Sequence, residues 1–201
     1  MTTTDNHVIQ VTSPPVDEDR ALAVLIAAFC ADPVIRWLFP DSRTYLRAFP
    51  ELARLMGGDA FVTGTAEVAA SYAGVALWVA PDARADEEAL GELLESSIDE
   101  DRIEGVFELL TLVTTHHPEE PVWYLPFVGV DPARQGTGIG AGLVRAGLVH
   151  ADLDGLPAYL EASTARNRAL YERLGFEVVG EIRAADSPPL WPMVRPAGAS
   201  R

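Results

Sequence analysis

Four glycines alternate along one short segment and lead directly into an apolar stretch. They are Gly136, Gly138, Gly140 and Gly142. Glycine lets the backbone approach a ligand closely and turn where a side chain would clash. The start of a helix adds unpaired N–H groups and the positive end of the helix dipole. The spacing predicts a phosphate-binding loop at a helix N-terminus, and a plain turn is the competing interpretation.

Two well-known phosphate loops fit this segment less well. A Walker loop is excluded because no Lys-Ser or Lys-Thr follows the glycines. The looser dinucleotide fingerprint matches Gly136, Gly138 and Ala141, with Asp154 as the acid for the ribose. However, five residues separate the preceding strand from the first glycine, and no repeated βαβ unit comes before it. A dinucleotide-dependent oxidoreductase therefore stays a lesser alternative.

Two polar residues at a helical spacing lie downstream of the glycines. Asn167 and Tyr171 are four positions apart, so on a helix they share one face. Gly175 then ends that helix, as glycine commonly does. Taken alone, Asn167 is explained by a helix N-cap and Tyr171 by a half-buried aromatic side chain.

The spacing Gln135-x-x-Gly138-x-Gly140 resembles the pyrophosphate-binding signature of the GNAT acetyltransferase superfamily. The resemblance implies that the backbone N–H groups of residues 135–141 hold the pyrophosphate of acetyl-CoA. It also implies a bulge in the preceding strand, whose exposed backbone pairs with the pantetheine arm at Val128 and Val130. The cofactor-binding residues predicted in this way are Val128, Gly129, Val130, Gln135, Gly136, Thr137, Gly138, Ile139, Gly140, Ala141, Asn167 and Tyr171.

The same resemblance implies roles for Asn167 and Tyr171 in binding and catalysis. Asn167 would bond the pantetheine arm, and Tyr171 would protonate the departing thiolate as the general acid. A thiolate leaving group needs a proton, and a phenol with a pKa near 10 is able to donate one. A backbone N–H near Val128 would stabilise the negative charge that develops on the acetyl oxygen.

The stretch 116–182 resembles the puromycin N-acetyltransferase branch of this superfamily. The likeness rests on Pro-Val-Trp at 121–123, Val-Gly-Val-Asp-Pro at 128–132 and Leu-Glu-Ala-Ser at 160–163. It implies transfer of the acetyl group of acetyl-CoA to a primary amine of a small molecule, such as an antibiotic-like or aminoacyl-nucleoside amine. Direct attack in a ternary complex is expected. The alternative from another class is a non-catalytic acyl-CoA-binding regulatory module.

An ammonium must lose a proton before its nitrogen attacks, so a base is needed. Strand 122–130 carries no acidic residue, whereas some family members keep a glutamate there. Glu161, at the end of a buried strand, is the favoured base, and a purely structural carboxylate is the competing interpretation. His116 and His117 are weaker candidates because adjacent side chains point apart. The His and Glu residues within 116–120 match no metal-ligand spacing, so no metal is predicted.

Composition narrows the partners and the compartment. The chain has 201 residues and a formal net charge of −15, from 15 Lys and Arg against 30 Asp and Glu. This charge disfavours nucleic acid and anionic membranes, favours a cationic substrate, and requires a CoA site that is locally positive or rich in N–H donors.

Cys30 is the single cysteine, so no internal disulfide forms. Apolar runs fall short of a membrane span and no signal peptide is visible, so we expect a cytoplasmic protein. The oligomeric state stays open, with a homodimer as one option.

The elements that must position these residues follow from periodicity and turn signals. Helices are expected at 19–31 after an Asp17 cap, 34–39, 42–56, 138–151 and 167–174; strands at 8–12, 68–72, 75–79, 122–130, 158–162, 176–182 and 190–195; and a helical insertion at 82–118. This order indicates an α/β or mixed α+β architecture. The resemblance adds one GNAT-like domain over 1–201 with its core signature at 122–182. It implies a central, mostly antiparallel sheet with helices on both faces.

Overall fold

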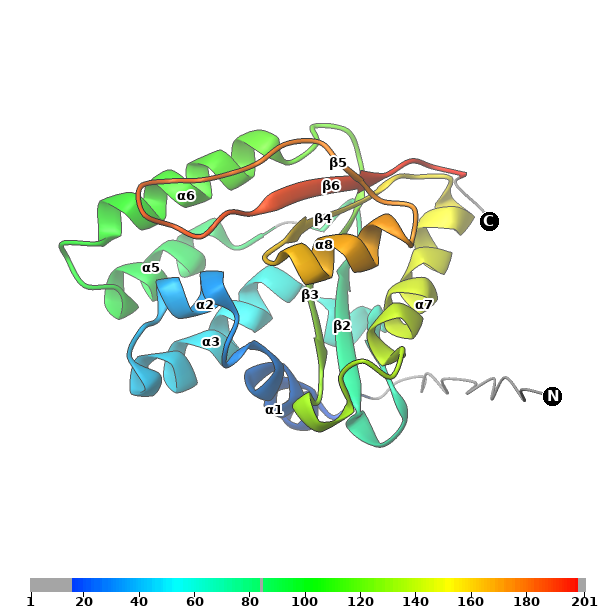
Figure 1. The fold of residues 1–201 in the computed structure, drawn as a ribbon, viewed down its shortest axis with the longest axis horizontal. Helices are drawn as coiled ribbons and strands as arrows, with labels where there is room; N and C mark the ends of the chain where they lie inside the picture. The colour runs from blue at the N-terminus through cyan, green and yellow to red at the C-terminus, as the bar shows by residue number, and fades with distance from the viewer. Residues whose placement is uncertain (1–15, 84, 199–201) are drawn as a thin grey trace.

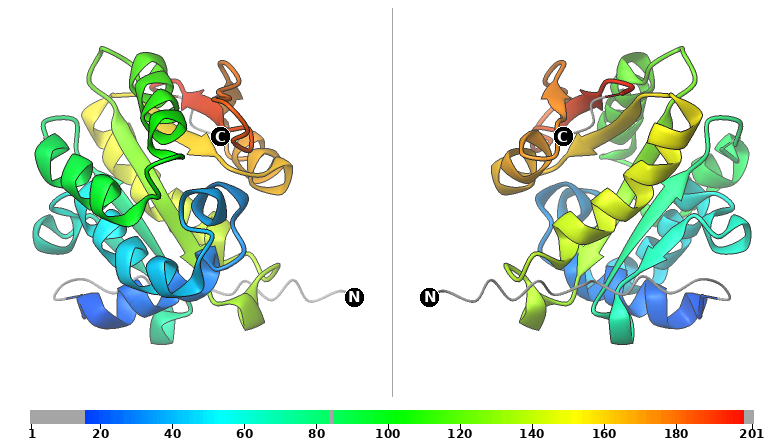
Figure 2. Two further views of the ribbon diagram at one scale, coloured as in Figure 1. Left: turned by 90° about the vertical axis from the view of Figure 1, so that its left-hand side faces the viewer. Right: turned by 90° about the vertical axis from the view of Figure 1, so that its right-hand side faces the viewer.

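The computed structural model describes residues 16–83 and 85–198, and within them the strands form a six-stranded sheet in the order β1-β2-β3-β4-β6-β5. All neighbouring pairs are antiparallel except β3 and β4. Figure 1 shows the arrangement, and Figure 2 shows helices on both faces of the sheet. The predicted mixed α/β fold is therefore confirmed. The predicted strand 8–12 lies outside the described residues.

The helices are α1 (Glu18–Phe29), α2 (Pro33–Leu38), α3 (Ser42–Gly57), α4 (Ala60–Thr63), α5 (Glu87–Ser97), α6 (Ile103–His116), α7 (Ile139–Asp154) and α8 (Ala165–Glu172), with 3-10 turns η1 (Ala70–Tyr72) and η2 (Pro132–Arg134). The strands are β1 (Ala66–Val68), β2 (Gly74–Val79), β3 (Trp123–Val130), β4 (Ala158–Ala162), β5 (Glu177–Val178) and β6 (Trp191–Arg195). The predicted helical insertion is thus the pair α5 and α6. Among the described residues, no helix has both the length and the apolar character to cross a lipid bilayer.

The two faces of the sheet bury different helices. Along β2, Val75 and Leu77 join a core with α1 and α3 on one face. Ala76 and Trp78 point the other way and join a core with α7 and α8. This alternation is the two-residue period of a strand. Because both of its faces are covered, β2 is apolar throughout, and the same helix layers flank β3 next to it.

Aspartates set where the first three helices begin. The side chain of Asp17 accepts a hydrogen bond from the N–H of Arg20, and Asp41 does the same for Thr44. Asp32 accepts from the N–H groups of the first turn of α2, where Pro33 occupies the first position. Proline lacks the N–H that would go unpaired there, so Asp-Pro is a good helix start. The predicted starts of all three helices are confirmed within two residues.

Two predicted strands are wrong in part. The strand expected at 68–72 ends at Val68, because Ser71 and Tyr72 have φ of 58° and 57°, outside the extended region. The Tyr72 hydroxyl instead accepts a hydrogen bond from the N–H of Asp17 at 2.7 Å. The strand expected at 176–182 is only the two residues of β5, which lie at the edge of the sheet and pair with β6 alone.

Strand β3 is irregular where it matters for a ligand. Leu77 pairs with Phe127, but Val79 pairs with Tyr124, so β3 carries one extra residue between these points. Such a residue makes a β-bulge and bends the strand. On its other edge, β3 pairs with β4 only through Trp123 and Tyr124. Beyond Tyr124 the two parallel strands part, so none of the described strands pairs with this edge of β3 there.

Candidate active site

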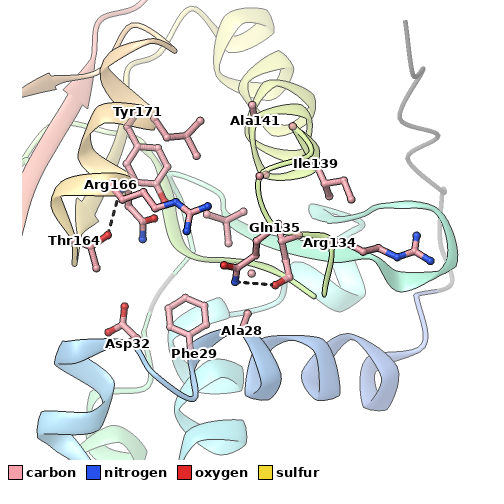
Figure 3. A pocket seen from close by; sticks show the side chains of 18 of the residues that line it. Ala28, Phe29, Asp32, Arg134, Gln135, Ile139, Ala141, Thr164, Arg166 and Tyr171 are labelled. Carbon is pink, nitrogen blue, oxygen red and sulfur yellow. Dashed lines mark hydrogen bonds between the residues drawn. The ribbon is translucent and has the colours of Figure 1, made fainter. Parts of the chain in front are cut away.

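A cavity of about 560 Å³ lies where β3 and β4 part, between α7, α8 and the end of α1. Figure 3 shows Tyr171 and Arg166 of α8 on one side of it and Phe29 and Asp32 on the other. All the predicted cofactor-binding residues line this cavity except Thr137. The hydroxyl of Thr137 donates to the carbonyl of Arg134 at 2.7 Å and so holds the loop itself.

The loop before α7 takes a shape that suits glycine. Gly136 and Gly138 have φ of 80° and 89°, in the left-handed region that other residues rarely adopt. No side chain caps the start of α7 at Gly138 in the described structure. The first N–H groups of a helix have no partner inside the helix, so those of Ile139, Gly140 and Ala141 remain available. This end of α7 therefore fits a pyrophosphate.

The edge of β3 offers further backbone groups. The N–H of Asp131 donates to the carbonyl of Ala73 at 3.0 Å, across the β2 edge. Hydrogen bonds to one neighbour alternate along an antiparallel strand, so Val130 and Val128 direct their N–H and C=O groups to the opposite, open edge. The amide of Gln135 donates to the carbonyl of Val130 at 3.4 Å on this edge. These are the two positions predicted to pair with the pantetheine arm.

Close packing of α1 against β3 closes one side of the cavity. A Cβ added at Gly129 would lie 2.8 Å from Cβ of Ala28 and 2.9 Å from Cδ2 of Leu25. Only a glycine lets the helix approach this closely. Ala28 and Phe29 thereby become part of the cavity wall.

The cavity is locally positive in a strongly acidic protein. Arg134, Arg145, Arg166 and Arg173 line it. Among the described residues that line it, Asp32 alone is acidic. The net charge of −15 requires such a local reversal if an anionic cofactor is to bind. The requirement drawn from composition is met by these side chains.

Tyr171 lines the cavity and is almost completely buried. Only 6% of its surface is exposed, and its ring packs against Phe176. Burial and then the nearby charge of Asp32 raise the pKa of its phenol well above the ordinary value, so the group holds its proton. The N-cap of α8 is Thr164, which accepts from the N–H of Asn167 at 3.1 Å. The explanation of Asn167 as an N-cap is therefore wrong, and it lines the cavity.

Asp32 is a site residue that the sequence did not reveal. Its Oδ1 caps α2, and its Oδ2 accepts a hydrogen bond from the Ser163 hydroxyl at 2.5 Å. Burial raises the pKa of this carboxyl above its ordinary value. Asp32 and Pro33 lie between the helices predicted at 19–31 and 34–39, but Ser163 lies 131 positions away from Asp32. No local signal joins the two.

Glu161 and the two histidines lie outside the lining of the cavity. The Tyr124 hydroxyl donates to Oε2 of Glu161 at 2.9 Å, and burial raises the pKa of this carboxyl to about 7. His117 packs against the rings of Tyr124 and Tyr159. Nδ1 of His116 lies 2.8 Å from the carbonyl of Leu112. The role of Glu161 as the base stays a prediction.

Glu161→Gln is expected to change how stability depends on pH. The folded pKa is about 7 against an ordinary value of 4.5, so between these pH values the folded state holds a proton that the unfolded state has lost. Stability therefore falls as pH rises through this window, by up to about 3 kcal/mol. The variant lacks this loss, so its advantage over the parent should grow from pH 4.5 to pH 8 in urea unfolding. Burial also raises the pKa of Asp32 and Glu67. Both groups are present in parent and variant, so their contributions cancel in the difference between the two. A difference in unfolding free energy between variant and parent that stays constant with pH would contradict the prediction.

Comparison with known proteins gives relatives that share this fold. An uncharacterized N-acetyltransferase of Schizosaccharomyces pombe is 28% identical over 174 residues, covering 80% of this chain and 70% of the relative. A structure described as histone acetyltransferase HPA2 and related acetyltransferase from Corynebacterium glutamicum has a TM-score of 0.67 and 28% identity, covering 96% of this chain and 99% of the other. The Drosophila melanogaster polyamine N-acetyltransferase has a TM-score of 0.63 and 15% identity, covering 92% and 99%, and shows the fold alone.

The family assignment rests on more than half of the chain. The model of the acetyltransferase (GNAT) family matches residues 70–176. This range spans β2 to the end of α8 and so includes the bulged strand, the glycine loop, Asn167 and Tyr171. The chain belongs to the GNAT family of acetyltransferases.

Proposed function

We propose that this protein transfers the acetyl group of acetyl-CoA to a primary amine of a small molecule, by direct attack in a ternary complex. One observation carries the proposal: a single cavity brings together the open start of α7, the buried phenol of Tyr171 and the carboxylate of Asp32. A site for an anionic donor, a proton donor and a proton acceptor thus share one space. A protein that only bound CoA would need the first of these alone.

The donor side is formed by backbone and arginine. Acetyl-CoA supplies the acetyl group as a thioester. The N–H groups at the start of α7 hold its pyrophosphate, and the four arginines that line the cavity make its surroundings positive. The backbone of Val128 and Val130 pairs with the pantetheine arm, and Asn167 lies one helical turn before Tyr171 on α8. An N–H near Val128 stabilises the negative charge on the acetyl oxygen.

Two side chains move the protons. Asp32 accepts a proton from the ammonium of the acceptor, and its raised pKa makes it a stronger base than an exposed aspartate. The free amine attacks the carbonyl carbon, the C–S bond breaks, and Tyr171 gives its proton to the thiolate. The attacking nitrogen loses its second proton to water as the amide forms, and water returns a proton to the Tyr171 phenolate. We assign the first step to Asp32 rather than Glu161 because Asp32 lines the cavity and Glu161 does not. The Schizosaccharomyces pombe relative, described as an N-acetyltransferase, supports nitrogen as the acceptor atom.

An amine panel tests this function. Thiol release from acetyl-CoA is measured with monoamines, diamines, aminoacyl nucleosides including puromycin, and lysine peptides. Turnover with at least one small amine, depending on both Asp32 and Tyr171, is the expected result. Calorimetric CoA binding without turnover on any amine would instead favour a regulatory module. Tight NADPH binding with no CoA binding would favour an oxidoreductase.

A further inference from the structure

A single hydrogen bond joins the two segments that carry the proposed proton acceptor and proton donor. The Ser163 hydroxyl donates to Oδ2 of Asp32 at 2.5 Å. Ser163 directly follows β4, and the next residue, Thr164, caps α8, the helix that carries Tyr171. Asp32 lies just before α2 and caps that helix. The bond therefore ties the start of α2 to the start of α8, on the two sides of the cavity where Figure 3 shows Asp32 and Tyr171.

The contacts of Asp32 hold its carboxylate in one orientation. A carboxylate has about four acceptor positions, shared between its two oxygens. Oδ1 accepts from the N–H of Val34 at 3.0 Å and of Ile35 at 3.1 Å, and Oδ2 accepts from Ser163. Among the described residues, these contacts leave an acceptor position on Oδ2, and Asp32 lines the cavity. Oδ2 is therefore the oxygen that is able to take a proton from a bound ammonium group.

Ser163 acts on this carboxylate without lining the cavity itself. Burial is the largest effect on the pKa of Asp32 and raises it, whereas the hydrogen bond from Ser163 is the largest effect that lowers it. A buried carboxyl group holds its proton more readily, and a protonated carboxyl group is not a base. The hydroxyl of Ser163 opposes this effect because it stabilises the charged form.

We propose that Ser163 is a positioning residue for the proton transfer: its hydroxyl holds the Asp32 carboxylate in place and widens the range of pH over which this carboxylate is charged. The inference rests on the proposed function, because Asp32 is the base proposed there. The proton moves from the ammonium nitrogen of the acceptor to Oδ2 of Asp32 and leaves a free amine. Ser163 keeps its own proton throughout.

The groups around Asp32 decide how its titration is measured. Tyr171 of α8 and Tyr45 of α3 have pKa values raised above the ordinary range, first by burial and in part by Asp32, so both phenols stay protonated up to pH 9. Glu161 lies two residues before Ser163 and has a pKa of about 7. The other charged or titratable side chains near Asp32 or Tyr45 are Cys30, Arg36 and Arg166. All of them are present in parent and variant, so the comparison isolates the effect of Ser163.

The first test follows kcat from pH 5 to pH 9 with an amine that the protein acetylates. Ser163→Ala removes an effect that lowers the pKa of Asp32, so the acid limb of the profile should move to higher pH. On that limb kcat should fall about tenfold, and at pH 9 about threefold or less, because one charge-assisted hydrogen bond is lost. Ser163→Thr keeps the hydroxyl and should restore the profile of the parent. Ser96→Ala is the matched control, because it removes an exposed hydroxyl that donates to the carbonyl of Leu93.

A double variant shows whether Ser163 acts through Asp32. Asparagine at position 32 is a good helix cap but not a base, so Asp32→Asn should remove the acid limb and keep the start of α2. In this background Ser163→Ala should change kcat by about twofold or less. An equal loss in both backgrounds, or an acid limb that Ser163→Ala leaves in place, would overturn the inference. Full activity of Asp32→Asn would overturn both the assignment of the base and the inference.

Carbon-13 NMR titration of the Asp32 carboxyl group in the CoA-saturated protein separates this inference from the proposed function. Ser163→Ala should move this titration to higher pH whether or not any amine is acetylated. Such a shift without acetyl transfer to any amine would overturn the proposed function and support the effect of Ser163 on the carboxylate. A titration that Ser163→Ala leaves unchanged would overturn the inference even in a protein that acetylates amines.

Discussion

Tyr171→Phe should lower kcat by about 10²-fold or more while acetyl-CoA affinity stays within a few-fold of the parent. The phenol is buried at 6% exposure, so the change removes a hydroxyl and leaves the ring and its packing against Phe176 in place. Without a proton donor, the thiolate must leave as an anion beside a buried wall of the cavity, where burial disfavours negative charge. Thiol release under saturating substrates measures kcat, and calorimetry measures the affinity for the cofactor.

The pH profile strengthens this test. Burial and Asp32 raise the pKa of Tyr171 well above its usual range, so the phenol stays protonated up to pH 9. The loss of kcat in Tyr171→Phe should therefore be similar at every pH up to 9. Tyr72→Phe is the matched control, because its hydroxyl accepts from the N–H of Asp17 and does not line the cavity. Equal turnover of Tyr171→Phe and parent at every pH would remove Tyr171 from the mechanism.

The cavity brings together the residues proposed to bind the acetyl donor, and this grouping was predictable because they lie in short sequence motifs. Alternating glycines between a strand and a helix specify backbone geometry, and backbone N–H groups do not depend on distant side chains. The same holds for Asn167 and Tyr171, which share a face of α8 by helical period alone. Thr137 is the exception within the loop, because its hydroxyl bonds the loop and not the cavity.

The acceptor half was not predictable, because it is assembled by tertiary contacts. Asp32, just before α2, meets Ser163, just after β4, only when the folded chain brings these two segments together. Glu161 was identified from its position at the end of a buried strand, but its burial between two tyrosines depends on the register of β3 with β4. The strand predicted at 68–72 was wrong for a similar reason: Tyr72 turns back to bond the start of α1, and this contact overrides its preference for a strand.

Gly147→Ala should destabilise the protein by roughly 3 kcal/mol, which corresponds to about 6–12 °C in Tm for a chain of this size. An added Cβ would lie 1.8 Å from Nε1 of Trp78 and 2.2 Å from its Cδ1. Trp78 is completely buried on β2, so its ring has no open space to move into. The helix preference of alanine over glycine, about 1 kcal/mol, opposes the clash but does not offset it. Thermal unfolding measures the loss.

Gly91→Ala is the control that separates the clash from the change in helix preference. A Cβ at this position in α5 meets no neighbouring atom within 4 Å. The free energy of unfolding of this variant should therefore rise by about 0.5–1 kcal/mol. We propose that the N–H groups at the start of α7 bind acetyl-CoA, so pushing α7 away from β2 should weaken acetyl-CoA binding in Gly147→Ala, whereas Gly91→Ala should leave it unchanged. Trp78→Phe in the Gly147→Ala background should recover part of the stability, since the smaller ring removes Nε1. A destabilisation of Gly147→Ala that Trp78→Phe does not relieve would show that the contact between α7 and β2 is not its cause.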